Sequence, residues 1–154
     1  MQIVVISDTH GRNEVFQEIR SRHPMASAFL HCGDSETDEV NLDGFVSVQG
    51  NNDYYTSYPS ERVIDLGEVR IYMTHGQYLR HHNRTETLIQ RAKDHECKIV
   101  LTGHTHVYNV EKKDGILLVN PGSLYHNRDM TLPSYALITI ENGKIKVQRL
   151  NYPR

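Results

Sequence analysis

The chain has 154 residues, of which 38% are hydrophobic and 23% are charged. This length and balance exclude a disordered or fibrous protein and predict a single domain over residues 1–154. The formal net charge of -2 leaves no excess of cations for a stable complex with nucleic acid, and no apolar run approaches the ~18 residues of a membrane span. Cys32 and Cys97 form no CxxC motif, so we expect a protein of the reducing cytoplasm.

Strand-like and helix-like segments alternate through the first two thirds of the chain. Residues 2–7 are almost wholly apolar and β-branched, which is typical of a central strand covered on both faces. A helix is predicted over 13–23, where Pro24 ends it, and a strand over 27–32 completes a βαβ unit. The remaining segments of this region are strands at 44–49, 70–74 and 98–102 and a helix at 85–96.

The last third of the chain has the pattern of antiparallel hairpins. Asp114-Gly115 and Asn142-Gly143 each separate two strand-like runs, and Gly67 marks a third turn of this kind. Two sheets packed face to face with helices outside them accommodate all these elements. The predicted fold class is therefore α/β (α+β), a four-layer β-sandwich flanked by helices.

Five of the predicted strands end at side chains that can bind a metal ion. In open α/β sheets, ligands bind outside the carboxyl ends of the strands, so we expect these five loops to converge on one crevice. Glycines beside these side chains would allow close approach of the backbone to an ion or phosphate. The candidate ligands are Asp8, His10, Asp34, Asn51, His75, His104 and His106, and the glycines are Gly11, Gly33, Gly50, Gly76 and Gly103.

The donor set indicates a transition metal. Four imidazoles, two carboxylates and a carboxamide suit Mn, Fe, Co, Ni or Zn, and they disfavour both a thiolate site and an all-oxygen calcium site. Seven ligands exceed what one ion with open positions takes, so we expect two ions that share a bridging carboxylate. In an extended loop, residues two apart point the same way, so Asp8 with His10, and His104 with His106, are each expected to address one site.

The order of five short motifs carries a family resemblance. "SDTHG", "CGD", "GNND", "THG" and "GHTH" resemble the signature blocks of the calcineurin-like metallophosphoesterases, specifically the small phosphodiesterases of the YfcE and YsnB type. The resemblance spans residues 3 to about 128 and includes "NPGS" at 120–123. It implies a β-sandwich flanked by helices and metal-dependent hydrolysis of phosphoesters, with a metal-bridging hydroxide as the nucleophile.

The same resemblance assigns roles to the ligands. It implies that Asp8, His10 and His106 bind the first ion, and that Asn51, His75 and His104 bind the second. Asp34 would bridge the two, and manganese is the ion most expected. Together with Asn52, the residues Asp34, Asn51 and His75 form the predicted catalytic set.

One motif departs from the family pattern at Asn52, where many relatives have histidine and others in this subgroup have cysteine. A carboxamide can donate a hydrogen bond to a phosphate oxygen but cannot act as a general acid near neutral pH. We therefore expect Asn52 to bind substrate and the protein to prefer good leaving groups. Arg12 and Arg128 are the cationic candidates for phosphate contact, and His126 is a candidate replacement acid.

Several other side chains have plainer interpretations. His81 and His82 suit a solvated loop, and His23 and His95 suit helix C-termini. His31 either orients a metal ligand or has a plain packing role in its buried strand. Cys32 is expected to be a buried inert thiol. Tyr54 and Tyr55 either line the leaving-group side of the site or cover the core.

Two classes of function fit this sequence. The first is a phosphodiesterase, or a phosphomonoesterase, acting on a small phosphoester or nucleotide. The second is a non-catalytic interaction scaffold, because the retromer complex contains a subunit of similar fold. All seven ligand positions are filled, which favours the enzyme. The sequence indicates no oligomeric state.

Overall fold

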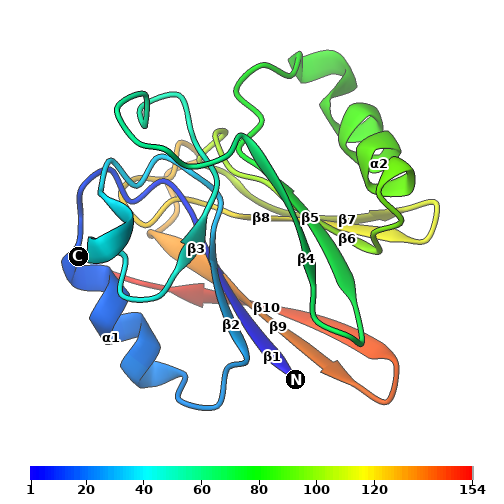
Figure 1. Cartoon of the computed structure of the whole chain (residues 1–154), viewed down its shortest axis with the longest axis horizontal. Coiled ribbons are helices and arrows are strands. Elements are labelled where there is room, and N and C mark those ends of the chain that lie inside the picture. Colours follow the sequence, from blue (N-terminus) through cyan, green and yellow to red (C-terminus); the bar gives the residue numbers. More distant parts are fainter. Residues whose placement is uncertain (154) are drawn as a thin grey trace.

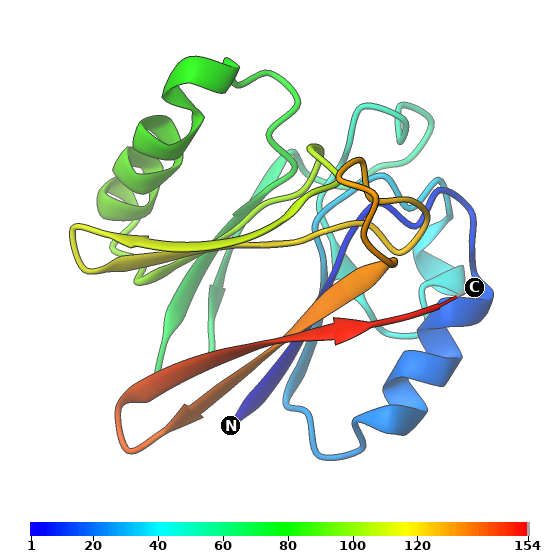
Figure 2. The same ribbon diagram turned by 180° about the vertical axis from the view of Figure 1, so that it is seen from behind.

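The protein is a sandwich of two five-stranded sheets, each covered on its outer face by one α-helix, in a computed structural model that describes residues 1–153 (Figure 1, Figure 2). The strand order is β10-β9-β1-β2-β3 in the first sheet and β4-β5-β6-β8-β7 in the second. This arrangement confirms the predicted fold class.

The first sheet and its helix are built from both ends of the chain. β1 lies at the centre, parallel to β2 and antiparallel to β9. The elements are β1 (Gln2–Ile6), α1 (Glu14–Arg22), β2 (Ala28–His31), the 3₁₀ helix η1 (Glu39–Asn41), β3 (Val46–Ser47), β9 (Ser134–Glu141) and β10 (Lys144–Asn151).

The second sheet comes from the middle of the chain. β5, β6 and β8 are parallel to one another, and β4 and β7 flank them in antiparallel orientation. The elements are β4 (Glu61–Asp65), β5 (Arg70–Thr74), the 3₁₀ helix η2 (His81–Asn83), α2 (Arg84–Asp94), β6 (Ile99–Leu101), β7 (Tyr108–Lys113) and β8 (Ile116–Pro121).

The predicted elements are present with small shifts in their bounds. The pairs β4-β5, β7-β8 and β9-β10 are antiparallel, as the turns at Gly67, Asp114-Gly115 and Asn142-Gly143 predict. The strand predicted over 44–49 is much shorter, because only two residues pair with β2. After Val48, the backbone N–H of Gln49 donates to Pro59 instead of continuing the sheet.

Side chains of β1 explain why its sequence is apolar at every position. Ile3 and Val5 lie in the core between the two sheets, whereas Val4 and Ile6 pack in the cluster that contains α1. Burial of such a side chain contributes roughly 1.5–3 kcal/mol. A strand with both faces covered holds the position of the loop that follows it.

The loops that follow the parallel strands gather at one end of the sandwich. The turns of the β4-β5, β7-β8 and β9-β10 hairpins lie away from that end (Figure 1). Glu68, Gly115 and Gly143, one from each of these turns, line one cavity. Below, the end with the loops is called the ligand end and the region of the three turns is called the hairpin end. The two sheets thus bring loops that are distant in sequence together at the ligand end.

Candidate metal centre

The loops after β1 and β2 remain paired beyond the last residues of their strands. The backbone N–H of Asp8 donates to Gly33 and that of His10 donates to Asp34, both at 3.0 Å. Since the strands are parallel, this pairing carries Asp8, His10 and Asp34 forward to the same place.

Five of the seven predicted ligands have left-handed backbone conformations. Their φ angles are 53° at Asp8, 46° at His10, 61° at Asp34, 74° at His104 and 59° at His106. For a residue with a side chain this conformation costs on the order of 1–2 kcal/mol, and such residues concentrate at functional sites. The loops are therefore not extended.

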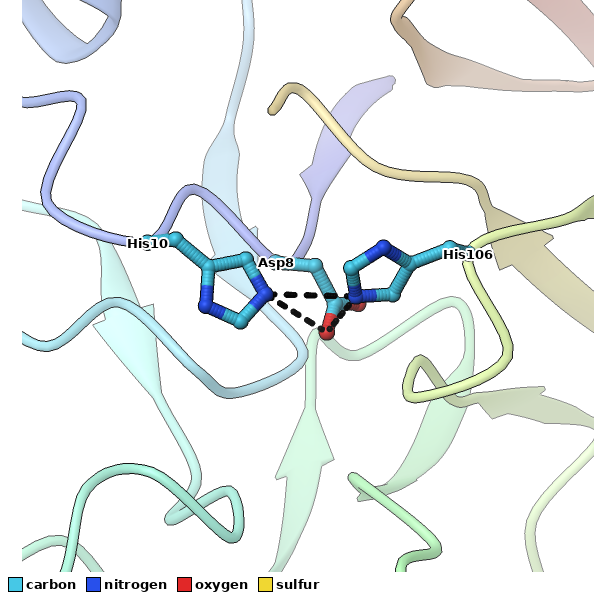
Figure 3. A group of neighbouring side chains, drawn as sticks. All are labelled: Asp8, His10 and His106. Atoms are coloured by element: carbon cyan, nitrogen blue, oxygen red, sulfur yellow. Dashed lines mark hydrogen bonds and ion pairs between the residues drawn. The ribbon is translucent and has the colours of Figure 1, made fainter. Parts of the chain in front are cut away.

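The first ligand group consists of Asp8, His10 and His106 (Figure 3). Nε2 of His106 lies 3.1 Å from Oδ1 of Asp8 and 3.2 Å from Nε2 of His10. Nε2 of His10 lies 3.8 Å from the same carboxylate oxygen. Two loops, the one after β1 and the one after β6, thus aim three donor atoms at one point.

The second ligand group consists of Asn51, His75 and His104. Oδ1 of Asn51 lies 3.1 Å from Nε2 of His75 and 3.2 Å from Nδ1 of His104. Asp34 lies between the groups, because its Oδ2 is 3.4 Å from Nε2 of His75 and 4.0 Å from Nε2 of His10. This carboxylate therefore lies within reach of histidines of both groups.

The expectation that His104 and His106 address one site is wrong. His106 contacts Asp8 and His10, whereas His104 contacts Asn51 and stacks edge-on against His75. The left-handed turns at both residues rotate the two imidazoles toward different groups. The alternation of side chains that holds in an extended strand does not hold here.

The donor atoms fit a pair of cations. Nδ1–H of His75 donates to the carbonyl of Cys32 at 2.7 Å, so Nε2 of the neutral ring carries a lone pair. That lone pair faces the oxygens of Asn51 and Asp34, which accept as well. Oδ1 of Asp8 is buried and has no hydrogen-bond partner among residues 1–153. A divalent cation would satisfy such a cluster of acceptors, of which the oxygens of Asp8 and Asp34 are buried.

The charges of the site agree with this interpretation. Burial raises the pKa of Asp8, but the neighbouring imidazoles of His75 and His106 hold the pKa of Asp8 well below its ordinary value. The pKa of Asp34 is likewise lowered, chiefly by His75, against the effect of burial. Burial lowers the pKa of His75, yet Asp8 and Asp34 outweigh it and raise that pKa. Both carboxylates are therefore anionic and attract a cation.

Gly33, Gly50 and Gly103 are required by the closeness of the ligands, and a Cβ atom on Gly33 would lie 2.7 Å from Nδ1 of His75. A Cβ atom on Gly50 would lie 2.2 Å from Oδ1 of Asp34, and one on Gly103 would lie 2.2 Å from Oγ of Ser7 and 2.9 Å from Oδ2 of Asp8. These glycines allow close approach of the backbone to ligand side chains, and the predicted close approach to an ion or phosphate stays a prediction. At Gly11, by contrast, a Cβ would meet no described atom within 4 Å.

Asp53 organises the Asp34 loop, and the sequence analysis did not find it. Its carboxylate is fully buried and accepts from the backbone N–H groups of Asp34 at 2.7 Å, Glu36 at 2.8 Å and Gly50 at 2.8 Å. It is the last residue of the "GNND" motif, so an acid placed directly after two asparagines was the available signal.

Arg84 organises the loops of the second group. Its guanidinium donates to the carbonyls of His75 at 3.2 Å, Gly76 at 2.7 Å and Gly103 at 2.7 Å. It therefore ties the loop after β5 to the loop after β6. The sequence offers no signal for this role, because Arg84 stands at the start of an ordinary helical pattern.

Asn52 contacts a ligand. Its backbone N–H donates to Oδ1 of Asp34 at 2.8 Å and its side-chain amide donates to Oδ2 at 3.0 Å. These two bonds hold the Asp34 carboxylate in place. The substrate-binding role of Asn52 stays a prediction.

The two candidate arginines differ in placement. Arg12 donates to Glu14 at 2.9 Å and to the carbonyl of Leu124 at 2.7 Å, and it lies over the Tyr152 ring, so these contacts do not bring it to the ligand cluster. Arg128 donates to the carbonyl of His104 at 3.4 Å, beside the cluster. Its predicted contact with phosphate suits this position, whereas that of Arg12 has no support in the structure.

An open pocket of about 420 Å³ lies beside the first group. Its walls include two ligands of that group, His10 and His106, and two other candidate functional residues, His126 and Arg128. The lining residues are His10, Glu36, His106, Tyr125, His126 and Arg128. His126 is thus within the same pocket, and its role as an acid stays a prediction.

The remaining candidates have structural surroundings. His31 is buried, bonds Oγ1 of Thr9 at 2.9 Å and accepts from the backbone N–H of Gly33 at 3.0 Å, so it links the two ligand loops of the first sheet. Burial lowers the pKa of His31 to about 3. Burial raises the pKa of the Cys32 thiol, as expected for an inert cysteine.

The plainer interpretations of the surface residues are resolved in part. His81 and His82 are exposed, and His23 bonds the hydroxyl of Tyr135 at 2.8 Å. Tyr54 is 82% exposed and Tyr55 is 55% exposed, so these rings do not cover the core.

Comparison with known proteins identifies the class to which this fold and site belong. The family model for the calcineurin-like phosphoesterase superfamily domain matches residues 1–143, and the chain therefore belongs to that superfamily. It is similar to the probable metallophosphoesterase YsnB of Bacillus subtilis (strain 168), with 34% identity over 154 residues that cover 96% of this chain and 89% of the relative.

Solved structures give the same class. A predicted phosphoesterase from Streptococcus pneumoniae TIGR4 has a TM-score of 0.90 at 34% identity, covering 97% of this chain and 88% of that one. A single mutant of Vps29 from Entamoeba histolytica has a TM-score of 0.74 at 24% identity and covers 99% of each chain, which shows a shared fold. No helix within residues 1–153 has the length and apolar character that crossing a bilayer requires.

Proposed function

We propose that this protein is a dinuclear metal-dependent phosphoesterase that acts on phosphodiesters. The observation that carries the proposal is the place of Asp34, whose Oδ2 lies 4.0 Å from Nε2 of His10 and 3.4 Å from Nε2 of His75. Asp34 is thus within reach of both ligand groups, and Oδ1 of Asp8 also lies 3.8 Å from Nε2 of His75. Membership of the phosphoesterase superfamily supports hydrolysis as the use of such a centre.

The two groups would hold one divalent ion each. Asp8, His10 and His106 would bind the first and Asn51, His75 and His104 the second, with Asp34 shared. Manganese is the proposed ion, and Fe, Ni, Co or Zn suit the same donors. When bound, a pair of such ions offsets phosphate charge and lowers the pKa of bound water from 15.7 to about 7.

The chain itself orients the ligands and shields part of the site from water. Asp8 and His75 are fully buried, and electrostatic interactions are stronger there than in bulk water. Asn52 holds the bridging carboxylate through two hydrogen bonds. Arg128, at the rim of the pocket, offers a guanidinium to the non-bridging oxygens of a phosphate group.

The charge of the pocket favours diesters. Glu36 and Arg128 line it together, so the arginine's positive charge is balanced by a carboxylate. Because these two charges cancel, the lining offers no net cation for the second negative charge of a phosphomonoester, whereas a diester carries only one negative charge. We therefore expect diesters to be hydrolysed faster than the corresponding monoesters.

The asparagine at position 52 predicts that the rate of hydrolysis depends on the leaving group. Without a histidine at this position, protonation assistance of typically ~10²–10⁴-fold has to come from water or from another group such as His126. Rates over a series of aryl phosphodiesters should fall steeply as the pKa of the leaving group rises. A flat series would show that a proton donor is in place.

Hydrolysis of bis-p-nitrophenyl phosphate with Mn²⁺ or Ni²⁺, combined with metal analysis, tests the proposal. We expect two ions per chain and turnover in the wild type, and loss of turnover in Asp34→Asn. Asp38→Asn, which changes an exposed carboxylate in the same segment, is the matched control and should retain activity. A wild type that is inert with every divalent ion, or equal rates in both proteins, would favour the non-catalytic scaffold instead.

A further inference from the structure

Glu36 contacts the ring of His10 on the side that faces away from the other ligands. Its Oε2 lies 2.8 Å from Nδ1 of His10, and its side chain is 35% exposed. The backbone at Glu36 is left-handed, with φ 57°, and its N–H donates to the buried carboxylate of Asp53 at 2.8 Å. This glutamate is therefore anchored beside His10 through its own backbone.

The contact decides which nitrogen of His10 carries the proton. A carboxylate accepts, so Nδ1 is the protonated nitrogen of the neutral ring and Nε2 carries the lone pair. Nε2 lies 3.2 Å from Nε2 of His106 and 3.8 Å from Oδ1 of Asp8. The lone pair is thus presented to the first ligand group.

His10 differs in this respect from two other histidines of the centre. Nδ1–H of His75 donates to the carbonyl of Cys32 at 2.7 Å, and that of His106 donates to the carbonyl of His126 at 2.8 Å. Both of those partners are neutral. A carboxylate partner makes an imidazole a stronger ligand than a carbonyl does, and it adds negative charge beside the ion.

We propose that Glu36 is a positioning residue for the first ligand group, which fixes His10 with Nε2 toward Asp8 and His106 and strengthens the hold of this group on a divalent cation. The part that concerns the cation rests on the proposed function. The part that concerns the orientation and protonated nitrogen of His10 holds in the metal-free protein.

The protonated nitrogen is tested by ¹⁵N NMR of histidine side chains in metal-free protein. We expect a single Nδ1–H form of His10 in the wild type and in Glu36→Gln, whose amide oxygen still accepts, and a mixture of the two forms in Glu36→Ala. A His10 signal in Glu36→Ala identical to that of the wild type would overturn the proposal. This result does not depend on any catalytic activity.

Calorimetric titration with Mn²⁺ tests the second part. Loss of a partner to a metal-binding histidine typically weakens binding by ~10–100-fold, and we expect this in one of the two binding steps for Glu36→Ala. Glu36→Gln should lose less, and Glu39→Gln, which changes an exposed acid of η1, should bind as the wild type does. Two unchanged steps in Glu36→Ala would contradict the role, whereas tight binding of two ions without hydrolysis would contradict the proposed function alone.

Discussion

At the hairpin end of the sandwich, Asp114 and Asn142 have φ angles of 54° and 52°, and a left-handed glycine follows each of them. These are the residues that a two-residue hairpin turn needs. A Cβ on Gly115 or Gly143 would meet no described atom within 4 Å, so the glycines there serve only the bend of the chain.

At the ligand end, the same backbone conformation belongs to the metal-binding side chains themselves. Asp8, His10, Asp34, His104 and His106 are left-handed, and three nearby glycines, Gly33, Gly50 and Gly103, are packed against ligand atoms. A turn alone does not require a histidine in this conformation. The difference indicates that the strain at the ligand end aims donor atoms, and that Asp53 and Arg84 offset its cost through hydrogen bonds.

The largest effect is expected where a glycine touches a ligand. In Gly50→Ala the new Cβ would lie 2.2 Å from Oδ1 and 2.5 Å from the backbone nitrogen of Asp34, and neither atom is free to move away. We expect activity to fall by on the order of 10²-fold, the effect of a displacement of about 1 Å, and stability to fall by about 1–3 kcal/mol. Steady-state kinetics and urea unfolding measure the two. Wild-type activity in this variant would show that Asp34 is not held against the Gly50 loop.

The next effect concerns the buried acid that joins two ligand loops. In Asp53→Asn, an amide group would face backbone N–H groups that now donate to a carboxylate, and unfolding free energy should fall by about 2–3 kcal/mol. Asp43→Asn is the control, since Asp43 is an exposed left-handed residue. Equal chemical denaturation midpoints for both variants would show that the hydrogen bonds of Asp53 do not stabilise the fold.

The burial of His31 predicts that the free energy of unfolding falls in acid. Burial lowers the pKa of this histidine from 6.5 to about 3. Between these values the unfolded chain binds a proton that the folded chain does not, so stability falls as the pH drops below 6.5, by up to about 1.4 kcal/mol per pH unit. Above pH 6.5 this contribution is fully present. Urea unfolding of metal-free protein at pH 7 and pH 5 should show a smaller loss in His31→Gln than in the wild type, and parallel losses would contradict the assignment.

The smallest effect is expected at the hairpin end. Gly115→Ala keeps a left-handed residue in open space and should cost about 1–2 kcal/mol of stability, with activity unchanged. A loss of metal binding in this variant, measured by the same titration as above, would mean that the two ends of the sandwich are coupled.

The positions of the ligands could be predicted because the end of a buried strand can be recognised in the sequence as the point where an apolar run stops. Each apolar run stops at a donor residue, and parallel strands bring their carboxyl ends together within each sheet. The packing of the two sheets then brings Asp34 of the first sheet next to His75 of the second. The three hairpins were equally visible at Gly67, Asp114-Gly115 and Asn142-Gly143. The short strand β3 was overestimated, because pairing partners and not apolar residues determine its length.

The orientation of the ligands could not be predicted. Left-handed backbone at non-glycine residues has no dependable sequence signature, so the extended-loop argument failed for His104 and His106. The contact between Glu36 and His10 joins two loops that are 26 positions apart in the sequence. The hydrogen bonds from Arg84 to three backbone carbonyls depend on where α2 begins. Such contacts arise only when the chain has folded.

Anomalous X-ray diffraction from crystals grown with Mn²⁺ tests the central claim most directly, because it locates the ions without reference to activity. We expect two peaks in each chain, one bound by Asp8, His10 and His106 and the other by Asn51, His75 and His104, with Asp34 bound to both. A single peak, or peaks bound by other residues, would contradict that claim.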